Sequence, residues 1–238
     1  VKKESRKIPT RAEIEKTWDI VNAMDFCQKK DDIVYDTFAS MHVVEAEAPD
    51  ELISAAAENA DTAIITLSRF SAEGVDRRAI SGDYYLSDAE KSLIDRVSSA
   101  FKKTIVVLNS GGVVDCEHFA ENDKVQGILC GWQGGMEGGM AVADILCGDV
   151  NPSGKLGDTI PKSYDCYENG KMFQTGYEHL DYEDDIYVGY RYFETIPGAA
   201  EKVRYPFGFG LSYTDFEMSG AFCGENEGKI VAVVTVKN

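Results

Sequence analysis

The chain has 238 residues, of which 44% are hydrophobic, so it is long enough and apolar enough to fold around a buried core. Its 24 Lys and Arg residues against 41 Asp and Glu residues give a net charge of −17. A surface of that sign repels phosphate backbones and anionic lipids, so we exclude nucleic acid and membranes as partners, whereas a neutral ligand remains compatible with it.

The amino-terminal residues and the cysteines predict a protein of a reducing compartment. Residues 1–7 contain neither a Met nor the apolar stretch of a signal peptide, so we expect the natural start of the protein to lie elsewhere. No run of the sequence is apolar for long enough to predict a transmembrane helix. The six cysteines lie far apart and form no CxxC pair, which predicts free thiols. We expect neither a metal ion nor a cofactor.

Helices and strands are expected to alternate along the first 148 residues. The expected helices span residues 10–28, 49–60, 86–102 and 137–146, and the expected strands span residues 62–67, 104–109 and 127–130. Ser87 and Glu90 have the spacing of a capping box at the start of one helix. The strands are apolar without alternation, as is typical of parallel strands covered on both faces. The sequence therefore predicts an α/β fold, a mostly parallel sheet flanked by helices in a flavodoxin-like α/β sandwich.

The pattern changes after residue 148. A turn signal at residues 151–154 is followed by a stretch rich in Tyr, Asp, Glu and Gly with little periodicity, which predicts an extended, aromatic-rich linker. Near the end, residues 229–236 form a lone run of β-forming residues. This run suggests the start of a second, all-β domain that is truncated.

Residues 68–77, which follow the first expected strand, have the composition of a catalytic loop. They include two carboxylates, two arginines and a glycine: Glu73, Asp76, Arg69, Arg77 and Gly74. Ligands bind at the carboxyl ends of strands in sheets of this kind. A carboxyl group beside a flexible glycine can project into a cleft there as a general acid. The alternative is a surface loop with two ion pairs, and composition alone leaves both open.

Two further loops follow the other expected strands. Residues 109–112 contain two glycines, which either admit a ligand to the backbone or form a tight turn. Residues 131–139 are rich in glycine and lead into a helix, so they either bind an anion or pack closely against the neighbouring strand. Within them, Trp132 is either a platform for a sugar or a core residue.

Five segments, in one order over residues 62–216, resemble the signature segments of glycoside hydrolase family 3. They are SRFSAEGVDR, LNSGGVVD, GWQGGMEGGMAVADILCGDVNPSGKLGDTIP, DIYVGYRYFE and RYPFGFGLSYTDF. The first resembles the acid/base loop of the family, and the third its W-x-x-G-x-E-G-G stretch. Five matches in the same order are far more specific than any lone motif.

The resemblance implies an architecture and a division of labour. In the family, an N-terminal (β/α) barrel precedes an α/β sandwich and often a fibronectin type III-like domain, with the active site between barrel and sandwich. The chain would then be a fragment with a sandwich domain at 1–162, a linker at 163–212 and a truncated fibronectin-like domain at 213–238. An aspartate of the barrel attacks the anomeric carbon, and a glutamate of the sandwich protonates the leaving oxygen.

By its place in the motif, that glutamate is Glu73. Ala72 stands where the family has a glycine, which should stiffen the loop. Because Glu73 has to be protonated at the working pH, we expect Arg69 to point away from it and to pair with Asp76. Five residues are candidates for substrate binding or support: Arg69, Ser71, Gly74, Asp76 and Trp132.

The resemblance implies a retaining β-glycosidase of the β-glucosidase type, acting on a β-linked glucoside or a short oligosaccharide. The parent's barrel would be its partner, the fragment alone should be inactive, and open β edges favour a homo-oligomer. We expect it in the bacterial cytoplasm rather than secreted. One alternative is a non-catalytic carbohydrate-binding or scaffold module on a flavodoxin-like fold. Another is a nucleotide-binding protein, which the missing phosphate-loop motif and the negative charge disfavour.

Overall fold

The computed structural model describes residues 47–69, 77–170 and 183–238 of the chain. The chain divides into two units, residues 1–46 and 47–238, and every described residue belongs to the second. The helix expected over residues 10–28 therefore lies outside the described part. Within the described ranges, no helix is both long and apolar enough to cross a membrane.

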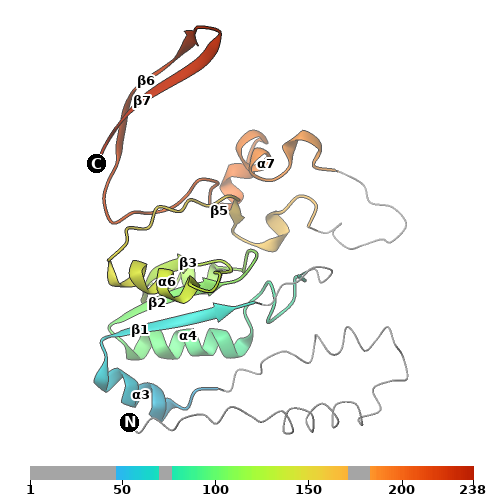
Figure 1. Ribbon diagram of the computed structural model, residues 1–238. Helices are drawn as coiled ribbons and strands as arrows, with labels where there is room; N and C mark the ends of the chain where they lie inside the picture. Colours follow the sequence, from blue (N-terminus) through green and yellow to red (C-terminus); the bar gives the residue numbers. More distant parts are fainter. Residues whose placement is uncertain (1–46, 70–76, 171–182) are drawn as a thin grey trace, which may run out of the picture. The chain divides into compact units, whose positions relative to one another are not determined.

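A parallel sheet of three strands forms the centre of the α/β part (Figure 1). The strands, in spatial order, are β1 (Thr62–Ser68), β2 (Lys103–Asn109) and β3 (Val125–Cys130). All three were expected from their apolar runs, and both strand pairs are parallel, as expected. The register between β1 and β2 is unbroken up to the pair Ser68 and Asn109, so these two strands end level with each other.

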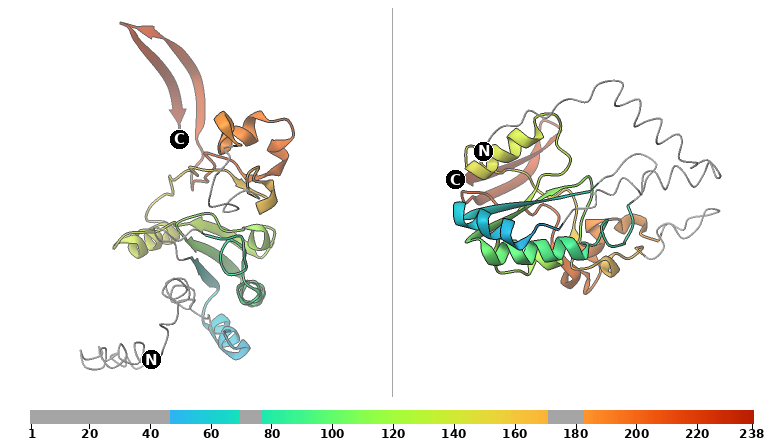
Figure 2. Two further views of the ribbon diagram at one scale, coloured as in Figure 1. Left: turned by 90° about the vertical axis from the view of Figure 1, so that its right-hand side faces the viewer. Right: turned by 90° about the horizontal axis from the view of Figure 1, so that it is seen from below.

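Helices lie on both sides of this sheet, but the expectation that each strand is covered on both faces is wrong for β1, where buried and exposed residues alternate and Ile64 is 54% exposed. The helices of the α/β part are α3 (Asp50–Asn59), α4 (Asp88–Ala100), α5 (Glu117–Ala120) and α6 (Gly138–Cys147). Figure 2 shows α4 and α6 on opposite faces of the sheet, with α3 beside α4. The flavodoxin-like α/β layering expected from the sequence is confirmed for these elements.

The core lies mainly between the sheet and α4. Its fully buried side chains include Leu67 of β1, Ile94 of α4, Val106 of β2 and Phe119 of α5. Burying a side chain of this size contributes about 1.5–3 kcal/mol each. The first turn of α4 is fixed by the expected capping box: the amide of Glu90 donates to Ser87 Oγ at 3.1 Å, and the amide of Ser87 donates to Glu90 Oε2 at 2.8 Å.

The described residues between positions 163 and 212 contain more regular structure than their composition suggests. It contains η1 (Tyr164–Cys166), η2 (Asp185–Tyr187), α7 (Tyr190–Thr195), η3 (Ala199–Lys202) and β5 (Val203–Tyr205). β5 pairs antiparallel with β4 (Ile160–Pro161), so hydrogen bonds cross the boundary expected at residue 162. A series of edge-on aromatic contacts runs from Tyr84 through Tyr164 and Tyr167 to Phe193, with ring centroids 5.2–6.4 Å apart. These contacts pack the aromatic residues of the segment against Tyr84 of the α/β part.

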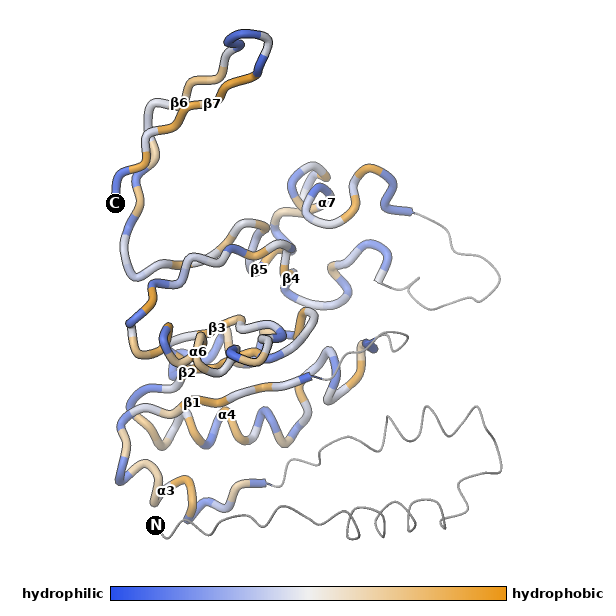
Figure 3. Tube along the Cα trace, viewed as in Figure 1, coloured by the Kyte–Doolittle hydropathy of each residue, from blue (hydrophilic) through white to orange (hydrophobic). Residues whose placement is uncertain are grey.

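The end of the chain forms a β-hairpin of β6 (Glu217–Asn226) and β7 (Lys229–Lys237). The expectation of a lone β run at residues 229–236 is wrong, because residues 217–226 supply its antiparallel partner. Between the two strands, Glu227 and Gly228 both have positive φ, as the common two-residue hairpin turn requires. Hydrophobic residues recur along both strands (Figure 3), and Met218, Phe222 and Ile230 are exposed.

Candidate functional site

The carboxyl ends of the three parallel strands bring three loops to one edge of the sheet. The amide of Arg69, directly after β1, donates to the carbonyl of Asn109 at the end of β2 at 3.1 Å. The amide of Gly131, directly after β3, donates to the carbonyl of Leu108 at 2.9 Å. Open α/β sheets bind their ligands at this edge, so the candidate loops lie where a site is expected.

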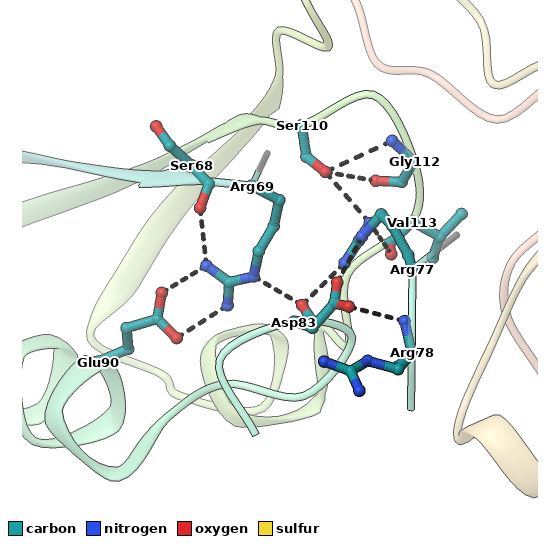
Figure 4. Close-up of polar contacts among 9 residues, drawn as sticks. All are labelled: Ser68, Arg69, Arg77, Arg78, Asp83, Glu90, Ser110, Gly112 and Val113. Atoms are coloured by element: carbon teal, nitrogen blue, oxygen red, sulfur yellow. Dashed lines mark hydrogen bonds and ion pairs between the residues drawn. The ribbon is translucent and has the colours of Figure 1, made fainter. Parts of the chain in front are cut away.

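Two arginines, Arg69 and Arg77, lie on either side of residues 70–76 in the sequence and bind the surrounding fold; we call them the anchors. Arg69 is the first (Figure 4). Its Nη1 and Nη2 donate to Oε1 and Oε2 of Glu90 at 2.6 and 2.8 Å, and its Nε donates to the carbonyl of Asp83 at 2.6 Å. Arg69 is 8% exposed and Glu90 is 4% exposed. A bidentate arginine–carboxylate pair in a buried setting fixes both partners in one geometry. The end of β1 is therefore tied to the first turn of α4.

Replacing Glu90 with Gln tests how much this anchor stabilises the fold. The amide nitrogen of the new side chain would face N–H donors, and the buried charge of Arg69 would lose its counter-ion, so we expect the free energy of unfolding to fall by about 3 kcal/mol or more. The matched control is Asp61→Asn, which removes an exposed pair with Lys102 and should cost less than about 1 kcal/mol. Urea unfolding of the two variants measures both values, and equal losses would contradict the role of the anchor.

Arg77 is the second anchor, on the other side of residues 70–76 (Figure 4). Its Nε donates to Asp83 Oδ1 and its Nη2 to the carbonyl of Asp83, both at 2.7 Å. Its Nη1 donates to the carbonyl of Val113 at 2.8 Å and to Ser110 Oγ at 3.2 Å. Arg77 thus joins the loop after β1 to the loop after β2.

The loop after β2 is a closed turn, the second of the two interpretations that its glycines allowed. Ser110, which is buried, donates through its hydroxyl to the carbonyl of Gly112 at 2.9 Å. The same hydroxyl accepts from Arg77, so this turn supports the second anchor. The carbonyl of Gly112 is thus engaged within the turn itself.

The loop after β3 combines close packing with a partly exposed tryptophan. A Cβ added to Gly131 would lie 3.4 Å from the carbonyl oxygen of Leu108, and one added to Gly134 would lie 2.8 Å from the Cα of Gly138. Only glycine fits the second position, which packs against the start of α6, whereas the expected packing against the neighbouring strand is found at Gly131. Trp132 has a φ of 51° and is 36% exposed, which makes it a surface residue at this edge and not a core residue.

The structure places two of the six candidate site residues, Arg69 and Trp132, at the same edge of the sheet. The other four lie outside the described residues: Ser71, Glu73, Gly74 and Asp76. Arg69 pairs with Glu90, where the sequence had suggested Asp76. Asp83 and Ser110 were not foreseen, because Asp83 acts across a turn and Ser110 acts on a residue 33 positions away.

The cysteines give no sign of another kind of site in the described part of the chain. Five of the six are described and all five are free, as expected. Burial raises the pKa of the Cys116 thiol to about 12, so at neutral pH it stays protonated and unreactive. Over residues 47–69, 77–170 and 183–238, no three His, Cys, Asp or Glu side chains are grouped to hold a metal ion.

Comparison with known proteins identifies the family of this chain. Residues 8–213 match the model of the glycosyl hydrolase family 3 C-terminal domain. Beta-glucosidase A of Butyrivibrio fibrisolvens is 44% identical over 82% of this chain and 28% of its own length. The exo-alpha-(1->6)-L-arabinopyranosidase of Bifidobacterium longum is 37% identical over 75% of this chain and 23% of its own length.

Solved structures agree with this family and with the fold. Beta-glucosidase 3B of Thermotoga neapolitana in complex with glucose has a TM-score of 0.68 and 42% identity over 75% of this chain and 25% of its own. A beta-glucosidase of Paenibacillus barengoltzii has a TM-score of 0.72 and 33% identity over 94% of this chain and 24% of its own. The chain spans about a quarter of the length of the relatives it matches. It belongs to glycoside hydrolase family 3, and it carries the C-terminal domain of that family.

Proposed function

We propose that this chain is the part of a retaining β-glycosidase, of the β-glucosidase type, that supplies the general acid/base glutamate, Glu73. The observation that carries the proposal is the pair of anchors around residues 70–76. The acid/base motif sits between Arg69 and Arg77, which the structure holds at the carboxyl end of β1. That edge is where a catalytic group of this fold is expected.

The ion pairs of the two arginines suit a general acid nearby. A retaining glycosidase needs two carboxyl groups about 5 Å apart, one ionised as nucleophile and one protonated as acid. An unpaired guanidinium beside the acid would hold its pKa low and keep it ionised. Arg69 is matched by Glu90 at 2.6 Å and Arg77 by Asp83 at 2.7 Å, so both positive charges are compensated before they can act on Glu73.

The remaining parts of the reaction belong to the longer protein. The nucleophile is assigned to an aspartate of an N-terminal barrel, because the family resemblance places it there. The substrate is assigned to the β-linked glucosides, because relatives of this chain are named as beta-glucosidases. Trp132, exposed at the same edge, is assigned as a contact for the sugar or its leaving group. Ser71, Gly74 and Asp76, from the same motif as Glu73, are proposed as supporting residues.

Assaying the full-length protein on aryl glycosides tests this function. We expect hydrolysis of 4-nitrophenyl β-D-glucoside, with the β-anomer of glucose appearing first in a proton NMR time course, because retention follows from two displacements. The α-L-arabinopyranoside is the comparison substrate, since one relative is named for that sugar. Turnover of neither substrate would favour the non-catalytic carbohydrate-binding module.

A further inference from the structure

One residue, Asp83, binds both anchors. Its carbonyl oxygen accepts from Nε of Arg69 at 2.6 Å and from Nη2 of Arg77 at 2.7 Å. Its carboxylate accepts from Nε of Arg77 at 2.7 Å and, through the other oxygen, from the amide of Arg78 at 2.6 Å. Arg69 and Arg77, the described residues on either side of positions 70–76, therefore bind one and the same residue (Figure 4).

The backbone around Asp83 is itself held in place. The amide of Asp83 donates to the carbonyl of Ile80 at 3.2 Å, and the amide of Tyr84 donates to the carbonyl of Arg78 at 3.2 Å. The ring of Tyr84 is buried and contacts Tyr164 edge-on. The main-chain carbonyl of Tyr84 accepts a hydrogen bond from the amide of Asp115 at 2.8 Å. Because these contacts fix the backbone of Asp83, Asp83 can in turn fix the side chains of the arginines that it binds.

The ion pairs of the two arginines differ in burial, so a substitution at one pair should affect the stability of the fold more than a substitution at the other. Arg69 is buried and its guanidinium also pairs with Glu90, so its loss would damage the fold. The pair of Arg77 and Asp83 is more exposed, with 16% and 20% of the side chains accessible. Breaking a pair that water partly reaches costs less stability than breaking a fully buried one. Removing the carboxylate of Asp83 should therefore release Arg77 at a smaller cost to the fold than removing Glu90 would have.

We propose that Asp83 is a positioning residue for catalysis, which sets the place of Glu73 by holding Arg77 at the end of the segment that carries it. This inference rests on the proposed function of Glu73 and names the device that aims it. A misplacement of a catalytic group by about 1 Å can cost about 10²-fold in rate. The loss should fall mainly on proton transfer, because the pair of Asp83 and Arg77 acts on the reaction through the segment that carries Glu73.

The test compares two substrates in the full-length enzyme carrying Asp83→Ala. Because an unactivated leaving group needs protonation and 2,4-dinitrophenolate hardly does, kcat/KM for cellobiose should fall about 10²-fold, and kcat/KM for the dinitrophenyl β-glucoside less than about threefold. A purely structural role would lower both values by the same factor. The control variant, Glu121→Ala, removes the ion pair with Arg204 and should leave both values unchanged.

A double variant separates this inference from the function beneath it. In the Glu73→Gln background, Asp83→Ala should cause no further loss for either substrate, because the group it positions is already gone. Multiplying losses would overturn the inference, and a Glu73→Gln variant with wild-type activity would overturn the proposed function instead. If Asp83→Ala does not fold, Arg77→Lys takes its place, since Lys keeps the charge and loses the planar fork. The same substrate selectivity is expected of it, and equal losses for both substrates would again overturn the inference.

Discussion

Replacing Glu73 with Gln in the full-length enzyme is expected to lower kcat/KM for cellobiose by about 10²- to 10⁴-fold, the usual contribution of a general acid. The amide keeps the size of the side chain and cannot give up a proton to the leaving oxygen. A dinitrophenyl glucoside leaves with little protonation, so its first step should be affected far less. Steady-state kinetics on the two substrates measure the difference.

The control for this variant is a glutamate elsewhere in the same domain. Glu51, exposed in the first turn of α3, can be replaced by Gln in the same way and should leave both substrates unaffected. Glu73→Gln with wild-type activity on cellobiose would show that another residue is the acid. An equal loss on both substrates would show that Glu73 serves the fold or substrate binding and does not transfer a proton.

The second large effect is the absence of catalysis by residues 1–238 alone. General acid catalysis gives its rate gain only with a nucleophile and a positioned substrate, and both are assigned to the barrel of the longer protein. Without the barrel, an acid at this edge is open to water and loses the burial that would raise its pKa. We therefore expect no hydrolysis of 4-nitrophenyl β-D-glucoside above the buffer rate at enzyme concentrations up to the solubility limit.

The full-length protein, assayed in parallel, is the positive control. Activity from a contaminating glycosidase is recognised by testing the Glu73→Gln form of the chain, because the contaminant's activity would be the same in both preparations. Turnover by the chain at an enzyme-like rate, abolished by Glu73→Gln, would contradict a site shared between two domains. It would place both carboxyl groups within these residues.

Local sequence signals predicted the α/β part well, because each of its elements carries its own information. The strands are continuous apolar runs, and the capping box of α4 needs only Ser87 and Glu90, three residues apart. The turn of the hairpin carries a weaker signal, because Gly228 suits its second central position but Glu227 is not of the Asn, Asp or Gly type that favours the first. Strand β6 forms through pairing with β7, and composition does not show such pairing.

The anchors around residues 70–76 could not be foreseen in the same way. Arginines and acids are common in surface loops, and spacing does not show which acid an arginine meets across 21 residues, as Arg69 meets Glu90. Glu90 was identified only as a helix cap, although its second oxygen serves both the cap and the arginine. Asp83 binds both arginines through its main-chain carbonyl, which any residue type possesses. Tertiary packing supplies this information.

The product formed by Glu73→Gln in azide tests the central claim most directly. Azide needs no general base, so it should attack the glycosyl-enzyme formed from dinitrophenyl β-glucoside and restore turnover. Attack on the α-linked intermediate gives the β-glucosyl azide, which proton NMR identifies by its anomeric coupling. The account predicts accumulation of this compound with Glu73→Gln and only glucose with the wild type and with Glu51→Gln. Failure of azide to restore turnover, or an α-glucosyl azide as product, would contradict Glu73 as the acid/base of a retaining glycosidase.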